Sequence, residues 1–196
     1  GRDIFSYFCL GCRNVSKLYV PHGYHFDMLL ETLHEYREMI LHNKYKNNFD
    51  YNFTLYIINN IPHKNNGCLL LKEDTSLQAR IASVHYEYYD DLHDLDAQLA
   101  DHKNDIQCVV SNVQLPQFQV LPFGQSQEPG LNDYADGVDI MQFLSALNFV
   151  REKVIDFNKP PEHPFAVCNP QPAVLFLEHL HLVAFFQTAQ NDIIRA

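Results

Sequence analysis

The chain has 196 residues, which suits one domain or one and a fraction, and 46% of its residues are hydrophobic, enough for a buried core. The formal net charge of −10 argues against nucleic acid as a partner. The sequence contains no basic amphipathic stretch for a membrane surface and no apolar run of about 18 residues, so no transmembrane segment is expected. Five cysteines at uneven spacings favour reduced thiols, and with no signal peptide recognised we expect a cytoplasmic protein.

The residues that carry chemistry are concentrated in the segment Phe5–Pro21, which contains Gly11 and Cys12. The apolar run Val15–Val20 predicts a strand that stops at Pro21. A cysteine shortly before a strand lies where backbone N–H groups can face its sulfur, and such donors favour the nucleophilic thiolate. The same donors can stabilise the oxyanion that forms when sulfur attacks a carbonyl. This pattern indicates acyl transfer to Cys12, and the alternative is a small buried hydrophobic residue.

The next part of the chain predicts two helices. Residues 26–41 carry leucines at helical spacing with glutamates on the other face, and Asp27 or the backbone before it is expected to cap this helix. An asparagine-rich stretch follows, in which aromatic residues at helical spacing predict a helix from about 49 to 60. Residues 62–67 combine proline, asparagine and glycine and therefore predict a turn.

Strands and a helix alternate in the middle of the chain. Strands are predicted over 68–72, 81–89 and 106–111 from their apolar or alternating patterns. Asp90 and Asp91 lie where an N-cap belongs, directly before leucines in helical register. This helix and the two strands that flank it form a βαβ-like unit, which favours the α/β class.

The remaining elements complete a domain that we place at residues 1–147. Residues 117–123 predict a strand, and 138–150 predict a helix from apolar residues at helical spacing. Residues 148–196 differ in character from the rest and are predicted to be a proline-rich linker followed by an apolar tail. The tail is either a docking segment or an artefact of the reading frame.

The tail contains an arrangement that suggests metal binding, Glu178-His179-Leu180-His181. Histidines two residues apart face different sides of a helix, and two ligands alone make a poor site. We therefore expect no metal.

A family resemblance rests on several of these strings. The glycine, cysteine and following strand of the first segment resemble the nucleophile segment of the aldehyde dehydrogenase superfamily. More closely, residues 11–17 (GCRNVSK), 45–48 (YKNN) and 133–139 (DYADGVD) resemble the LuxC-type acyl-CoA reductases of bioluminescence and fatty acid metabolism. The resemblance covers roughly residues 1–144 and implies an aldehyde-dehydrogenase-like catalytic domain, a sheet flanked by helices.

The resemblance also implies a function. It suggests an oxidoreductase that reduces a long-chain fatty acyl-CoA to the aldehyde with NADPH, through a thioester intermediate on the catalytic residue Cys12. The substrate is an acyl-CoA or an acylated carrier, and the family leaves room for a homo-oligomer. Because the sequence has no Gly-x-Gly-x-x-Gly string, NADP is expected to bind mainly to residues outside this chain. The N-terminal dinucleotide-binding domain is then missing, and the isolated chain is expected to be inactive as a reductase.

Further site residues follow from the same resemblance. It suggests that the loop strings after residue 120 return toward the cysteine, which makes Phe123, Gly124, Gln125 and Asp136 candidates for lining the substrate or nicotinamide site. Turn chemistry explains the Pro-Gly and Asp-Gly pairs of these loops equally well. Beside the cysteine itself, the candidates that line the site are Gly11, Arg13 and Asn14. The last two either orient the strand or bind the acyl carbonyl.

Alternatives remain open at the level of the sequence, both for the cysteine pair and for the whole chain. Cys9 and Cys12 form a C-x-x-C pair, which also occurs in redox dithiols and zinc sites, although no second pair follows at ligand spacing. Cys9 departs from the family pattern, which usually has a small residue there, and a disulfide between the two would silence the nucleophile. For the whole chain, the alternatives are a CoA-independent aldehyde dehydrogenase and a non-catalytic interaction module.

Overall fold

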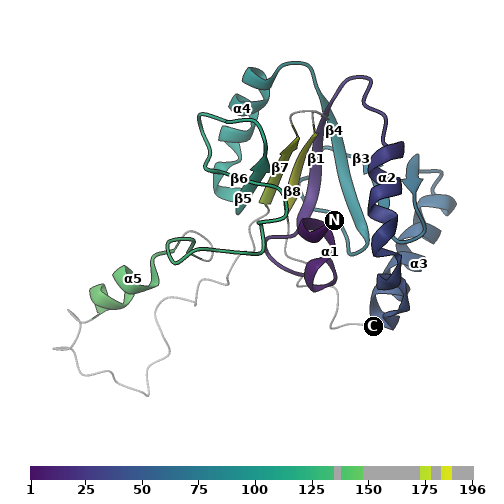
Figure 1. Cartoon of the computed structure of the whole chain (residues 1–196), viewed down its shortest axis with the longest axis horizontal. Helices are drawn as coiled ribbons and strands as arrows, with labels where there is room; N and C mark the ends of the chain where they lie inside the picture. The colour runs from purple at the N-terminus through teal and green to yellow at the C-terminus, as the bar shows by residue number, and fades with distance from the viewer. Residues whose placement is uncertain (135–137, 148–172, 178–181, 187–196) are drawn as a thin grey trace. The chain divides into compact units, whose positions relative to one another are not determined.

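The computed structural model describes residues 1–134, 138–147, 173–177 and 182–186 (Figure 1). The chain divides into two compact units. One consists of Gly1–Glu128 together with Pro170–Ala196, and the other of Pro129–Asn169. The first unit contains the sheet, and the helix α5, Ile140–Leu147, lies in the second unit.

A mixed sheet forms the centre of the first unit. Its strands are β1 Val15–Pro21, β2 His63–Asn65, β3 Leu70–Glu73, β4 Ser83–Tyr89, β5 Cys108–Ser111, β6 Val120–Leu121, β7 Ala173–Leu177 and β8 Leu182–Phe186. They lie in the order β2-β3-β4-β1-β7-β8-β5-β6. Neighbouring strands pair in parallel except for β2 on β3 and β8 on its partners, which are antiparallel.

Helices cover both faces of this sheet. They are α1 Arg2–Phe5, the 3-10 segment η1 Ser6–Cys9, α2 Asp27–Leu33, the 3-10 segment η2 His34–Leu41, α3 Asn43–Ile58, α4 Leu92–Asp101 and the 3-10 turn η3 Lys103–Asp105. In Figure 1, α2 and α3 lie on one side of the strands and α4 on the other. The protein is therefore α/β, with a mixed sheet flanked by helices, as the sequence predicts at that level.

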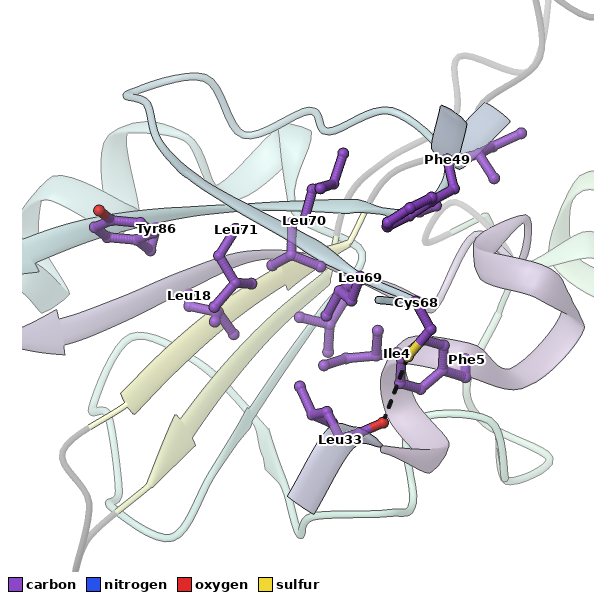
Figure 2. Close-up of a cluster of buried hydrophobic side chains, with 14 of the residues drawn as sticks. Ile4, Phe5, Leu18, Leu33, Phe49, Cys68, Leu69, Leu70, Leu71 and Tyr86 are labelled. Atoms are coloured by element: carbon purple, nitrogen blue, oxygen red, sulfur yellow. Dashed lines mark hydrogen bonds between the residues drawn. The ribbon is translucent and has the colours of Figure 1, made fainter. Parts of the chain in front are cut away.

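The larger core lies under α1, α2 and α3. Alternate residues of β1 and β4, among them Leu18 and Tyr86, face it, as does the continuous apolar run 68–71 at the start of β3 (Figure 2). Leu33 and Phe49 close this core from the helical side. The other face of the sheet packs Tyr19 of β1 and Val109 of β5 against α4 in a second, smaller core.

Several predicted elements are confirmed. The strand predicted before Pro21 is β1, the strands predicted over 68–72, 81–89 and 106–111 correspond to β3, β4 and β5, and α4 follows Asp91. The Asp91 carboxylate accepts a hydrogen bond from the His93 N–H at 3.2 Å, which makes it the N-cap. β4, α4 and β5 form the predicted βαβ unit, with β1, β7 and β8 lying between its two strands in the sheet order.

The helix predictions need two corrections. Residues 26–41 are not one helix, because the α-helix ends at Leu33 and continues as 3-10 turns, where Tyr36 stacks on the Phe5 ring at 4.9 Å. Asp27 is not its cap but lies in the first turn, where a negative charge favours the helix dipole. The second helix begins at Asn43 and not near 49, because Tyr45 is buried one turn before Phe49 on the same face.

The strand predictions also need corrections. Residues 62–67 contain the edge strand β2, whose polar side chains gave no strand signal because it is held by backbone pairing with β3. The strand predicted over 117–123 is reduced to Val120–Leu121. The apolar tail contributes two strands, β7 and β8, that the sequence analysis did not assign. The helix predicted over 138–150 is described only as far as Leu147, and the proline-rich stretch lies outside the described residues.

Candidate functional site

Cys12 lies at the centre of a tight turn just before β1. The Asn14 N–H donates to the Gly11 carbonyl at 3.0 Å, and the Gly11 N–H donates back to the Asn14 side-chain oxygen at 2.6 Å. Cys12 and Arg13 are thus the two central residues of the turn. The Cys12 side chain is exposed, and among the described residues its backbone N–H has no acceptor. The turn therefore presents a thiol and a free N–H together.

The Asn14 side chain holds this turn in place. Its Nδ2 lies 3.2, 3.0 and 2.8 Å from the carbonyl oxygens of Asp3, Ile4 and Ser6, and its Oδ1 is used by Gly11. Asn14 is 2% exposed. All of these partners are backbone groups, so the Asn14 amide ties the end of α1 to the turn. Its geometry favours the orienting role over contact with a substrate.

A second set of contacts attaches the loop 122–128 to the same turn. The buried Asp3 carboxylate accepts hydrogen bonds from the Gly124 N–H at 2.6 Å and the Ser126 N–H at 3.0 Å. The Arg13 Nε donates to the Ser126 carbonyl at 2.5 Å. A carboxylate that receives two backbone N–H groups makes strong, charge-assisted bonds. Asp3 and Arg13 therefore clamp this loop beside the residues that flank Cys12.

Gly11 has no room for a side chain. A Cβ on this residue would lie 2.5 Å from the Asn14 Oδ1 and 3.4 Å from the Gln127 Oε1. The first of these distances is below any tolerable contact, so a side chain would force the Asn14 amide out of the turn. Gly11 is therefore required by close packing and not by a left-handed backbone. The second distance shows that the Gln127 carboxamide lies against the residue that precedes Cys12.

Cys9 differs from Cys12 although the two are separated by only two residues. Tyr7, Phe8 and Cys9 have left-handed φ angles of 53°, 59° and 60°. This turn directs the Cys9 sulfur inward to within 4.0 Å of the Tyr45 hydroxyl, and burial raises the pKa of the thiol to about 12. The Tyr45 hydroxyl in turn donates to the Cys68 carbonyl at 2.7 Å. Cys9 is thus a half-buried thiol that packs against the larger core and has little thiolate character.

The left-handed turn also exposes a group of apolar side chains. Tyr7 is 67% exposed, Phe8 38% and Leu10 40%. Only the Phe8 ring has a described aromatic partner, His42, at 4.2 Å between the ring centres. Left-handed conformations of bulky residues cost roughly 1–2 kcal/mol each. The chain thus holds an apolar surface beside Cys12 in spite of local strain.

Most of the predicted site residues lie in this region. Gly11, Arg13 and Asn14 form the turn, and Gly124 is bound to Asp3. Gln125 takes part in a turn with Pro122 and is exposed, whereas Phe123 is half-buried and packs against the larger core. Asp136 lies outside the described residues. The loop around 124 does return to the cysteine segment, as the family resemblance suggested for that part of the chain.

Asp3, Ser126 and Gln127 are not among the site residues predicted from the sequence. Asp3 gave a weak signal, an acidic residue directly before the apolar pair Ile4-Phe5, and it is 5% exposed. Its partners are backbone N–H groups more than a hundred residues away, and backbone donors leave no mark in a sequence.

A second polar cluster lies on the α4 side of β1, and it is fully built into the fold. The Lys17 ammonium is completely buried, and it donates to the Glu87 carboxylate and the Asp74 carbonyl, each at 2.5 Å. Burial lowers the pKa of Lys17, and the bond to Glu87 opposes this effect. His85 bonds through Nδ1 to the Ser76 carbonyl at 3.0 Å, and burial lowers its pKa to about 4. These side chains hold the loop 74–80 on the sheet.

The residues that the structure describes include neither a candidate metal centre nor a membrane-spanning helix. Within them, no three or more His, Cys, Asp or Glu side chains gather into a group that could hold a metal ion. No described helix has both the length and the apolar character that a membrane crossing requires.

Comparison with known proteins identified no relative of this chain. No family model matches the sequence, and no curated protein or solved structure was found to match it.

Proposed function

We propose that Cys12 is an acyl-accepting nucleophile and that the chain is the catalytic part of a LuxC-type, long-chain acyl-CoA reductase with an aldehyde-dehydrogenase-like fold. The observation that carries the proposal is the exposed Cys12 thiol on a turn whose own N–H has no acceptor among the described residues. The family resemblance of the strings at 11–17 and 133–139 supports it.

The step assigned to this chain is thioester exchange. The Cys12 thiolate attacks the carbonyl carbon of the acyl-CoA, and the electron pair of the C=O bond moves onto oxygen. When the carbonyl re-forms, the bond from carbon to the CoA sulfur breaks. CoA leaves as a thiolate and takes up the proton that Cys12 released. The acyl group is then held as a thioester on Cys12, and no oxidant or reductant is needed.

Three features of the site support this chemistry. The Cys12 N–H lies on the nucleophilic residue itself, where it can donate to the developing oxyanion. The apolar side chains of Tyr7, Phe8 and Leu10 are exposed on the same short segment, and a fatty acyl chain is the kind of group that apolar surface binds. The Asp3 and Arg13 clamp fixes the turn, which reduces the cost of orienting substrate and sulfur.

The described residues do not fit NADPH. A dinucleotide phosphate site needs unpaired cations or a glycine-rich set of N–H donors at a helix start. Near Cys12, the Arg2 Nη2 pairs with Glu128 at 2.9 Å, the Arg13 Nε bonds the Ser126 carbonyl, and the Gly124 N–H is given to Asp3. We therefore derive no reduction step from this chain and assign NADPH binding to residues outside it.

The proposal is tested by intact-mass spectrometry after incubation with myristoyl-CoA. We expect a single myristoyl adduct on the parent chain and on Cys9→Ser, and none on Cys12→Ser. Cys9→Ser is the matched control, because it removes a half-buried thiol of raised pKa from the same segment. An adduct that persists on Cys12→Ser contradicts the assignment of the nucleophile. A parent chain that takes up no acyl group favours the non-catalytic module.

A further inference from the structure

Two polar side-chain atoms on the loop 122–128 are buried without a partner. They are the Gln127 Nε2 and the Ser126 Oγ, and Ser126 is fully buried. A buried donor without a partner costs about 1–3 kcal/mol. Here two consecutive residues each have such a group. The backbone of their loop is firmly bonded to Asp3 and Arg13, so poor packing does not explain the missing partners.

The Gln127 amide lies next to the nucleophile. Its Oε1 is 3.4 Å from the point where a Cβ of Gly11 would stand, and Gly11 is the residue before Cys12. The Oε1 and Nε2 of a carboxamide are bonded to the same carbon, so the Nε2 lies within a few ångströms of the same turn. The position of the loop is set by the Ser126 backbone, whose N–H and carbonyl are both bonded. The Gln127 side chain therefore extends to Gly11 from a backbone whose position is fixed.

From this geometry we propose that Gln127 is a catalytic residue that donates a hydrogen bond to the acyl carbonyl oxygen during attack by Cys12. The proposal rests on the function proposed above and adds a side-chain donor to the Cys12 N–H. A tetrahedral intermediate carries a full negative charge on that oxygen, and two donors are a common arrangement for stabilising it. The unpartnered Nε2 is the group that this oxygen would satisfy.

The ligand class follows from the donor. A neutral amide N–H selects an oxygen that becomes anionic without requiring a permanent charge, which fits a thioester or ester carbonyl. Alkylation of the same sulfur by iodoacetamide displaces iodide and forms no oxyanion. Loss of a donor to the acyl oxygen should therefore slow acylation by a thioester but not alkylation by iodoacetamide. A general effect on the Cys12 thiol should slow both reactions.

The experiment measures both rates at Cys12 in the parent chain, Gln127→Ala and Gln127→Glu. Acylation by myristoyl-CoA is followed by intact mass, and alkylation by iodoacetamide under the same conditions. We expect both variants to slow acylation by on the order of 100-fold, the usual effect of losing one oxyanion donor, while alkylation stays within twofold of the parent. Gln119→Ala is the matched control, an exposed glutamine just before β6.

Slower acylation with unchanged alkylation supports the role of Gln127 as a donor to the acyl oxygen. Acylation of both variants at the parent rate overturns the inference and leaves the proposed function standing. An equal slowing of acylation and alkylation also overturns it, because Gln127 then only shapes the turn. No acylation of the parent chain removes the proposed function and this inference together. Gln127→Glu keeps the size of the side chain, so a packing defect in Gln127→Ala is recognised by comparison.

Discussion

At the scale of single residues, the segment before β1 gives two nearby cysteines opposite environments. Three left-handed residues turn the Cys9 sulfur toward Tyr45, while the Gly11–Asn14 turn leaves the Cys12 sulfur exposed. Left-handed φ angles at bulky residues are unusual and tend to occur at functional sites. The strained turn therefore leaves the Cys9 thiol half-buried against the core and the Cys12 thiol exposed.

Thiol alkylation tests this difference. Burial raises the pKa of Cys9 to about 12 and that of Cys68 to about 11, so at pH 8 only about one Cys9 in 10,000 is a thiolate. We expect iodoacetamide to label Cys12 at least ~100-fold faster than Cys9 or Cys68, as measured by peptide mass spectrometry over time. In guanidinium the three rates should become similar. Equal rates in the native chain would contradict the assigned environments.

The residues of the candidate site divide into those a sequence can reveal and those it cannot. Cys12 and Gly11 are visible because a local pattern places them before a strand. Asp3 and Gln127 are not, because they act through backbone groups or through a neighbour more than a hundred residues away. Side-chain-to-backbone contacts across the chain have no local pattern. The clamp could therefore be found only from the structure.

At the scale of elements, the polar face of β1 and β4 holds the loop 74–80. Ser16 donates to the Leu77 carbonyl at 2.7 Å, and Lys17 and His85 bond the carbonyls of Asp74 and Ser76. Lys72 forms an ion pair with the Asp74 carboxylate on the same loop. Side chains from three neighbouring strands thus replace the hydrogen bonds that a loop without regular structure lacks.

The buried His85 makes stability depend on pH in a defined window. Burial lowers its pKa from 6.5 to about 4, so between these values the unfolded chain binds the proton and the folded chain does not. Its contribution is full above pH 6.5 and is lost as the pH falls toward 4. We expect the unfolding free energy of the parent, relative to His85→Asn, to fall by about 2 kcal/mol from pH 7 to pH 5.

The measurement is urea unfolding at each pH, and the comparison isolates His85 from its neighbours. Asp74, Lys72 and Lys17 lie close to the His85 ring and are present in both chains, so their effects largely cancel in the difference. His93→Asn is the matched control, because the His93 side chain is 90% exposed. A difference that does not change with pH would mean that the His85 imidazole is not held neutral by burial.

Elements with a strong local pattern were predictable, and those set by distant contacts were not. β1, β4 and the Asp91 cap of α4 follow from apolar runs and a capping residue. The early start of α3 depends on Tyr45, which fills the core and bonds the Cys68 carbonyl. The edge strand β2 depends on pairing with β3. The family-level fold and the division at residue 147 stay predictions.

At the scale of the whole first unit, one sheet is shared by two cores. Alternate residues of β1 belong to different faces, so Leu18 packs in the larger core and Tyr19 in the smaller. The polar cluster around Lys17 lies on the same face as the smaller core, where it contacts the loop 74–80. Loss of either core therefore destabilises the same strands, and we expect the two cores to unfold together.

Truncation of one leucine in each core tests this coupling. Leu71 and Leu99 are both fully buried, on opposite faces, so each change to alanine is expected to lower the unfolding free energy by about 2–5 kcal/mol. Because both faces use β1 and β4, each variant should unfold in a single transition, with far-ultraviolet and tyrosine signals changing at the same urea concentration. Leu131→Ala, at a residue that is 100% exposed, should shift the midpoint little. A separate early transition in Leu99→Ala, with the larger core still folded, would show that α4 and its core form an independent layer on a sheet that is stable without them.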